Sequence, residues 1–193
     1  MTVTSPPIAP IRRTISVSWG PEEAFERFTA RFGEWWPRKT HSIGGKKVRT
    51  IGFECRVGGQ IYEELDDGRC FQWGRVTEWD PPRTVGFIWH PSRDESTAQH
   101  VSIRFLPEGT GTQVDLISTG WEKLGARAAK ERKSYDAGWG TVLAAFGGRF
   151  SALTAVFRGV QAFRTGWLRF TGRLDAAIDA CGGKIPAKSV RTG

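Results

Sequence analysis

The chain changes its hydrophobic period after residue 119, and this change constrains the fold more than any other feature of the sequence. From residue 48 to residue 119, apolar and polar side chains alternate in short segments that turn residues separate. Beyond residue 134, apolar residues recur instead at spacings of three and four. Alternation is typical of strands with one buried face, and the second spacing is typical of an amphipathic helix. The sequence therefore predicts a one-sided sheet followed by a helix that can cover it.

Seven segments carry the strand pattern. The first is residues 11–19, and the others are residues 48–56, 60–65, 69–79, 84–90, 98–106 and 112–119. Gly58 and Gly59 favour a two-residue hairpin turn, because glycine tolerates positive φ. Pro81 and Pro82 are expected to end a strand, since neither can donate a backbone N–H. Connections this short between neighbouring strands predict an antiparallel meander.

Two helices are predicted on either side of the six-strand meander. Pro21, followed by two glutamates, forms a helix start. Phenylalanines from Phe25 to Phe32 share one face, and Pro37 ends this helix. The second helix has Ser134 as its predicted N-cap and a length of about 18 residues. Its apolar positions are Tyr135, Trp139, Val142, Leu143, Phe146 and Phe150.

Composition argues against several classes of protein. The longest stretch without a charge, residues 137–148, is shorter than the roughly 20 residues of a membrane-spanning helix. The first residues lack the basic start and apolar run of a secretory signal. Cys55, Cys70 and Cys181 form no C-x-x-C pair, which argues against a disulfide framework or a zinc knuckle and favours buried thiols. We therefore expect a cytoplasmic protein.

Three groups of residues carry a resemblance to a known family. They are Val57-Gly58-Gly59-Gln60-Ile61-Tyr62-Glu63 with Asp67-Gly68, the run from Trp73 through Trp79-Asp80-Pro81-Pro82-Arg83 to Trp89, and Gly109 to Leu116 followed by Gly120-Trp121 and Gly138-Trp139. The chain resembles the START-like (SRPBCC) superfamily over residues 10–152, and within it the homologues of the heat-shock protein 90 ATPase activator. This resemblance implies the α+β helix-grip fold, in which a curved antiparallel sheet of about seven strands wraps a long C-terminal helix.

The resemblance also carries expectations about function. It implies a pocket between the sheet and the long helix, with no fixed catalytic residues in this branch. It further suggests contact with a chaperone ATPase and a part in the stress response. Some START-like relatives are cyclases or hydrolases, so such an activity is a further alternative.

Charge and periodicity divide the chain into an expected N-terminal arm, residues 1–10, a START-like domain, residues 11–152, and an extension, residues 153–193. The whole excess charge of +8 lies in residues 120–193. The extension has the pattern of a basic amphipathic helix, which would bind an anionic membrane surface or an acidic partner. Gly159, Gly166 and Gly172, within the helical pattern of the extension, favour instead a helix packed on the domain, or partial disorder. No recognisable nucleic-acid-binding fold is present, so we expect no nucleic-acid partner.

The 9 tryptophans either fill the core or line a pocket for an apolar or aromatic ligand. A dry cavity of about 300 Å³ would cost about 7 kcal/mol, so an open pocket must be wetted, occupied or narrowed by large side chains. A collapsed core is the alternative. The predicted ligand-binding residues are Trp73, Arg75, Phe87, Trp89, Val101, Ile103, Leu116, Trp139, Leu143 and Phe146.

Arg75 is the charged member of this set, because it shares the parity of Trp73 on a predicted strand. A charge among apolar side chains is costly unless it is paired. Arg75 could pair with Glu63, which lies among apolar residues of the preceding strand, or it could orient an anionic ligand. A bulge in the strand would instead turn Arg75 to solvent.

Catalytic and metal motifs are missing from the sequence. His41, His90 and His100 lack the H-x-x-x-H and H-E-x-x-H spacings of metal sites. The chain has no Gly-x-Ser-x-Gly elbow, no phosphate-binding loop and no dinucleotide fingerprint. We therefore predict no catalytic residue, no metal and no cofactor. The predicted function is binding of a small hydrophobic or aromatic molecule, with a co-chaperone-like contact or a cyclase or hydrolase activity as alternatives.

Overall fold

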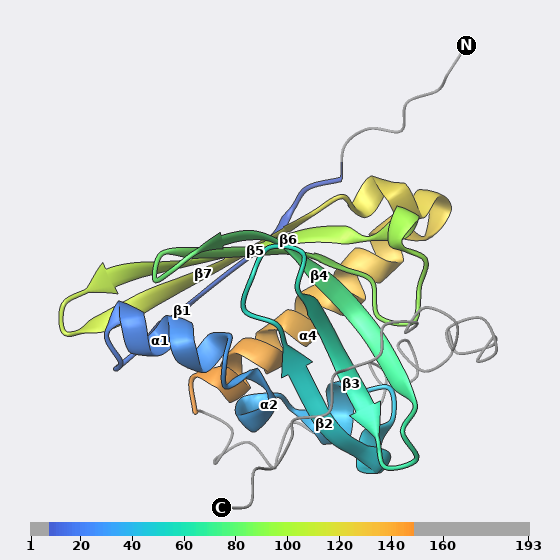
Figure 1. The fold of residues 1–193 in the computed structure, drawn as a ribbon. Helices are drawn as coiled ribbons and strands as arrows, with labels where there is room; N and C mark the ends of the chain where they lie inside the picture. The colour runs from blue at the N-terminus through green and yellow to red at the C-terminus, as the bar shows by residue number, and fades with distance from the viewer. Residues whose placement is uncertain (1–7, 149–193) are drawn as a thin grey trace, which may run out of the picture.

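One antiparallel sheet, in the order β1-β7-β6-β5-β4-β3-β2, forms the framework of the molecule (Figure 1). The computed structural model describes residues 8–148. The strands are β1 (Ile11–Val17), β2 (Val48–Phe53), β3 (Gln60–Leu65), β4 (Cys70–Asp80), β5 (Thr84–Trp89), β6 (Gln99–Glu108) and β7 (Gly111–Thr119). Every neighbouring pair is antiparallel. The predicted meander is confirmed, and β1 joins it beside β7.

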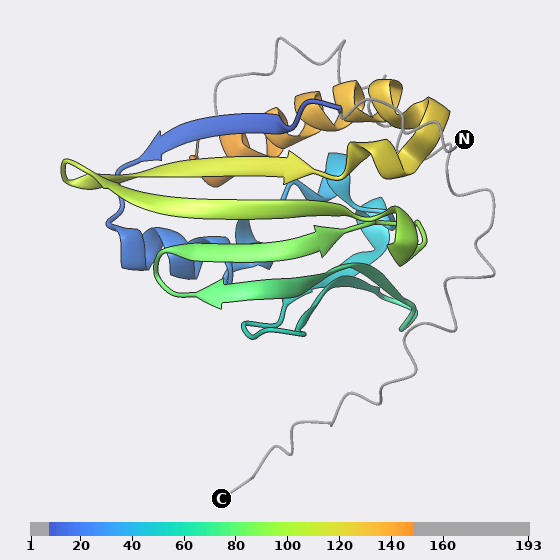
Figure 2. The same ribbon diagram turned by 90° about the horizontal axis from the view of Figure 1, so that it is seen from above.

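The helices lie on the concave side of this curved sheet (Figure 1). They are α1 (Pro21–Phe28), α2 (Phe32–Trp35), α3 (Arg38–His41) and α4 (Ala128–Phe146), and the 3-10 helices are η1 (Gly45–Lys47), η2 (Glu95–Thr97) and η3 (Trp121–Arg127). Helix α1 contacts β6 and β7, α2 contacts β2, and α4 runs beside β1 at the sheet edge (Figure 2). This arrangement confirms the expected helix-grip fold.

Alternation along the strands sets which face is buried. In β6, Val101, Ile103 and Phe105 point into the core, and in β7 Val114 and Leu116 do so opposite them. The intervening residues of both strands lie on the convex face, which carries no covering layer in the described chain (Figure 2). The predicted inward parity of these strands is therefore confirmed.

The long helix begins earlier than predicted. Its first residue is Ala128, because η3 leads directly into it, and Ser134 lies inside the helix rather than at its N-cap. The helix ends at Phe146, where the N–H of Gly147 donates to the carbonyl oxygen of Leu143 at 2.9 Å. Phe150, which we expected in the last turn, lies outside the described residues.

The single helix predicted from Pro21 to Pro37 is divided into α1 and α2, and a further short helix, α3, follows Pro37. The hydroxyl of Thr29 donates to the carbonyl oxygen of Phe25 at 2.8 Å, and such bonds compete with helix continuation. The chain then turns back, and the indole of Trp35 donates to the carbonyl oxygen of Arg27 at 2.8 Å. Side-chain hydrogen bonds to the backbone therefore accompany the end of α1 at Phe28, although the apolar spacing continues to Phe32.

The turn at Gly58 and Gly59 is also longer than predicted. Strand β2 ends at Phe53, so residues 54–59 form a loop rather than a two-residue hairpin. This loop folds onto β4, where the N–H of Gly58 and the carbonyl oxygen of Gly59 both bond to the backbone of Val76. Gly58 has φ +79°, and a Cβ on Gly59 would lie 2.2 Å from the carbonyl oxygen of Glu54. Glycine is therefore required at these two positions for the loop to turn tightly and lie against β4.

Several expectations concern surface and boundaries. Cys55 is exposed and Cys70 half-buried, so the prediction of buried thiols is wrong for Cys55. Cys181 and the extension, residues 153–193, lie outside the described residues, and the domain boundaries stay predictions. Within residues 8–148, none of the helices combines the length and the apolar character that crossing a bilayer requires.

Candidate functional site

A small cavity lies where the sheet, α4 and the chain around α3 meet. About 10 Å³ of it is open to the centre of a water molecule, which is room for about one water. Its wall is formed by Trp36, His41, Trp89, Tyr135, Gly138, Trp139 and Val142. This cavity is therefore nearly filled by the side chains of its own walls, which are mainly aromatic.

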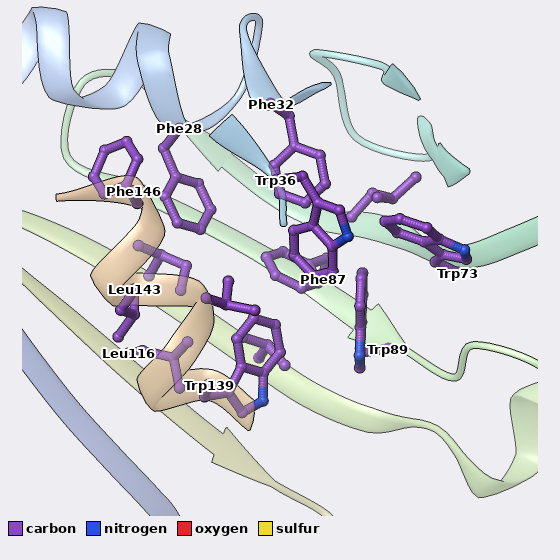
Figure 3. Close-up of a cluster of buried hydrophobic side chains, with 14 of the residues drawn as sticks. Phe28, Phe32, Trp36, Trp73, Phe87, Trp89, Leu116, Trp139, Leu143 and Phe146 are labelled. Carbon is purple, nitrogen blue, oxygen red and sulfur yellow. The ribbon is translucent and has the colours of Figure 1, made fainter. Parts of the chain in front are cut away.

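Tryptophan rings from separate elements meet in the interior between sheet and helix (Figure 3). The ring centroid of Trp36 lies 5.0 Å from that of Trp73 and 5.7 Å from that of Trp89. The ring of Trp139 reaches Trp89 from α4, with 5.5 Å between the centroids. These tilted arrangements are favourable aromatic contacts. One continuous layer of indoles thus joins the helix, the sheet and the residue after α2.

Three of the indoles bury a hydrogen-bond donor that has no acceptor. The Nε1 atoms of Trp73, Trp89 and Trp139 are inaccessible to solvent and bond to no atom of residues 8–148. In contrast, Trp36 donates to the carbonyl oxygen of His41 at 3.2 Å and Trp121 to that of Ser118 at 3.1 Å. Figure 3 shows the three nitrogens on the sides of their rings that face away from Phe28 and Phe146.

These donors are costly where they lie. An indole N–H can only donate, so a ligand or a water must supply the acceptor. Each buried donor without a partner costs about 1–3 kcal/mol. Because Trp89 and Trp139 line the cavity, a molecule placed there could receive both hydrogen bonds.

His41 contributes the imidazole on the cavity wall. It is the last residue of α3, and its Nδ1 lies 2.7 Å from the hydroxyl oxygen of Thr40. Burial lowers the pKa of His41 to about 4, so the ring is neutral at pH 7. The sequence alone suggested only an ordinary loop histidine here, because its burial depends on the packing of α3 under Trp36.

Glu63 ties the same segment to the sheet. Its carboxyl oxygens accept the backbone N–H groups of Ile43, at 3.1 Å, and Gly44, at 2.7 Å. Burial raises the pKa of Glu63 to about 7, although these two donors act in the opposite direction. We call residues 32–44, which include α2 and α3, the strap. Glu63 therefore anchors the end of the strap to β3.

Arg75 does not point into the interior. The register between β3 and β4 shifts so that Trp73 is skipped, and both Trp73 and Val76 are buried, three positions apart. Arg75 lies between them on the outer side and pairs with Glu95. The alternative of a bulge is confirmed, and the suggested pair with Glu63 is wrong. Glycine within a strand often marks a bulge, so Gly74 was the available sequence signal. In the structure, a Cβ at Gly74 would lie 2.0 Å from the carbonyl oxygen of Ile88.

The remaining predicted ligand-binding residues are all buried, but the structure does not gather them around one space. Trp89 and Trp139 line the cavity, and Trp73 packs against Trp36 and Trp89 behind it. The others belong to the wider core without lining the cavity: Phe87, Val101, Ile103, Leu116, Leu143 and Phe146.

Five wall residues were missed by sequence reasoning: Trp36, His41, Tyr135, Gly138 and Val142. Three of them lie on α4, and the apolar spacing of that helix was the available signal. Nothing in the sequence pattern marks the two strap residues. Among residues 8–148, no group of three His, Cys, Asp or Glu side chains is arranged to hold a metal ion.

Comparisons with known proteins agree with this architecture. The family model described as "Activator of Hsp90 ATPase homolog 1-like protein" matches residues 19–150. A crystal structure from Mycobacterium smegmatis has 13% identity and a TM-score of 0.53, over 74% of this chain and 91% of that one, and shows the same fold.

Two further solved structures are similar. An anthrahydroquino-γ-pyrone synthase has 32% identity and a TM-score of 0.48, over 69% of this chain and 90% of its own. The Aha1 dimer from Colwellia psychrerythraea has 18% identity and a TM-score of 0.48, over 72% and 97%. No curated protein matches the chain.

Proposed function

The chain belongs to the family of Activator of Hsp90 ATPase homolog 1-like proteins, and from this premise we propose that it binds a small aromatic or apolar molecule between the sheet and α4. One observation carries the proposal. The indole N–H groups of Trp89 and Trp139 are buried at an aromatic cavity and have no acceptor among residues 8–148. A bound molecule with a carbonyl oxygen would accept hydrogen bonds from both indole N–H groups.

The wall that would move to admit such a guest is the strap. On the opposite side, Gly138, Trp139 and Val142 belong to the 19-residue helix α4, whose backbone is held by its own hydrogen bonds. Helices α2 and α3 have four residues each. The end of the strap is held by the two backbone bonds to Glu63. Displacing Trp36 and His41 would therefore widen the cavity at lower cost than moving α4.

A guest in the widened cavity would contact the indoles first. Flat aromatic rings would stack against Trp89 and Trp139, with Trp73 behind them. Only a larger guest would reach Phe87 and Leu143 in the deeper core. Arg75 has no part in this binding, since it pairs with Glu95 on the outer side of β4.

The test uses 2-acetylnaphthalene, a neutral aromatic ketone, and the emission of the protein's tryptophans. We expect saturable quenching by the wild-type protein. Val142→Ala, which removes volume from the cavity wall, should bind the probe more tightly. Val114→Ala, a matched control at a buried position that does not line the cavity, should leave the affinity unchanged. Absence of saturable binding, or equal responses of the two variants, would refute the proposal.

A second candidate function is favoured by the description of the family model, which names an activator of the Hsp90 ATPase. The chain would then contact a chaperone ATPase. The measurement is the steady-state rate of ATP hydrolysis by the Hsp90 of the same organism, with and without this chain. A rate that changes in a saturable manner supports this candidate, and a rate that is unchanged at excess chain removes it.

A further inference from the structure

Next to the cavity lies an arginine without a counter-ion. Arg93, in the loop between β5 and β6, donates through Nη2 to the amide oxygen of Gln99 and to the hydroxyl of Tyr135, the latter at 3.3 Å. Its Nε and Nη1 atoms are buried and have no acceptor among residues 8–148. Arg93 takes part in none of the ion pairs found in those residues. Both side chains that accept a hydrogen bond from Arg93 in this part of the chain are neutral.

Tyr135 connects this arginine to the cavity. The Cζ atom of Arg93 lies 5.4 Å from the centroid of the Tyr135 ring, and Tyr135 itself is part of the cavity wall. Burial raises the pKa of Tyr135, so the phenol is neutral at pH 7 and does not balance the charge. Arg93 is thus one side chain away from the space in which a guest would lie.

The loop holds Arg93 in this position. Its backbone N–H donates to the carbonyl oxygen of His90 at 2.8 Å, and its own carbonyl oxygen lies 3.0 Å from Nδ1 of His90. Asp94 accepts the backbone N–H of Ser96 at 2.9 Å, and neither Asp94 nor Glu131 of α4 is among the ion pairs of residues 8–148 with Arg93. The arginine is therefore held beside the cavity without a carboxylate of its own.

We propose that the guest is an aromatic carboxylate, and that Arg93 binds its carboxylate group. This inference rests on the proposed function. Two indole N–H groups on the cavity wall and two N–H groups of Arg93 behind Tyr135 have no acceptor among residues 8–148. No Asp or Glu side chain from this part of the chain lines the cavity. A carboxylate would supply acceptors and the missing negative charge together, and the same positive charge disfavours a cationic guest.

The test compares two probes that share a ring system and differ in charge, 2-naphthoate and 2-acetylnaphthalene. At pH 7 we expect the wild-type protein to bind 2-naphthoate about tenfold more tightly, as is typical when a hydrogen bond gains a charged partner. Arg93→Gln should abolish this preference and leave the affinity for 2-acetylnaphthalene unchanged. Arg93→Lys, which retains the charge, should keep part of the preference. Arg13→Gln removes an exposed arginine that pairs with Asp136, and should behave as wild type.

The outcomes separate this inference from the proposed function. If neither probe binds, the proposed function fails and the inference fails with it. If 2-acetylnaphthalene binds and 2-naphthoate binds no more tightly, the guest is not an anion and only the inference is overturned. The same holds if the preference survives in Arg93→Gln. Should that variant lose both probes through misfolding, Arg93→Lys decides, because loss of the preference with intact binding of the neutral probe contradicts a role for charge.

Discussion

Two buried titratable groups of the strap region should give opposite contributions to the pH dependence of stability. Burial raises the pKa of Glu63 from its usual 4.5 to about 7, and lowers the pKa of His41 from 6.5 to about 4. The protonated Glu63 stabilises the fold fully below pH 4.5, and this contribution is lost as the pH rises through 7. The neutral His41 stabilises the fold fully above pH 6.5, and its contribution is lost as the pH falls through 4.

The two contributions nearly cancel between about pH 5 and about pH 6.5. There the folded state carries a proton on Glu63, and the unfolded state carries one on His41 instead. Each group alone would change the free energy of unfolding by about 1.4 kcal/mol per pH unit, with opposite signs. Together they bind the same number of protons in both states. The stability contributed by this pair should therefore be almost flat in that range.

Glu63→Gln removes one side of this balance. The free energy of unfolding of the variant, relative to wild type, should fall by about 1.4 kcal/mol for each pH unit as the pH is lowered from about 6.5 to about 5. The lost contact with a strap N–H adds an offset that does not depend on pH. The measurement is urea unfolding at a series of pH values, analysed by linear extrapolation.

Glu64→Gln is the matched control for this experiment. Glu64 is the next residue of β3 and pairs with Arg49 on the other side of the sheet. Its curve should run parallel to that of wild type between about pH 5 and about pH 6.5, because this variant retains both Glu63 and His41. A Glu63→Gln curve that is also parallel to wild type would show that Glu63 is ionised throughout, and would refute the reasoning.

Three further substitutions test which contacts hold the fold, with urea unfolding as the measurement. Phe28→Ala removes a fully buried ring that packs against Phe32, Trp35, Phe105 and Phe146, and should cost about 3–5 kcal/mol. Gly74→Ala places a Cβ 2.0 Å from the carbonyl oxygen of Ile88 and should cost about 1–3 kcal/mol by forcing β4 and β5 apart. Arg13→Ala breaks an exposed 2.8 Å ion pair with Asp136 and should cost less than about 1 kcal/mol. The reverse order of effects would contradict this assignment.

The fold was accessible from the sequence wherever a local pattern decides the local structure. Residues 101–105 and 114–118 alternate because a strand with one buried face requires it, and short connections leave few alternatives to an antiparallel meander. The central helix was likewise visible in the spacing of Trp139, Leu143 and Phe146. Its start was not, since η3 continues into α4 without a capping side chain.

Less of the candidate site than of the fold could be predicted from the sequence. The bulge at Trp73 turns Arg75 outward. A prediction from strict alternation of buried and exposed residues does not allow for the extra residue of a bulge. Trp36 and His41 reach the cavity from a strap whose helices are too short to show a period. The pairing of Glu63 with the backbone of Ile43 and Gly44 joins residues that are about 20 positions apart.

The sequence by itself determined a one-sided antiparallel sheet covered by an aromatic helix, because hydrophobic period and turn residues act over a few positions at a time. Only the tertiary structure decided which indole nitrogens lack an acceptor, and which arginine forms no ion pair, among residues 8–148. That outcome depends on how large side chains from four separate elements fill one volume, and a small change in the path of any of them would redistribute the space.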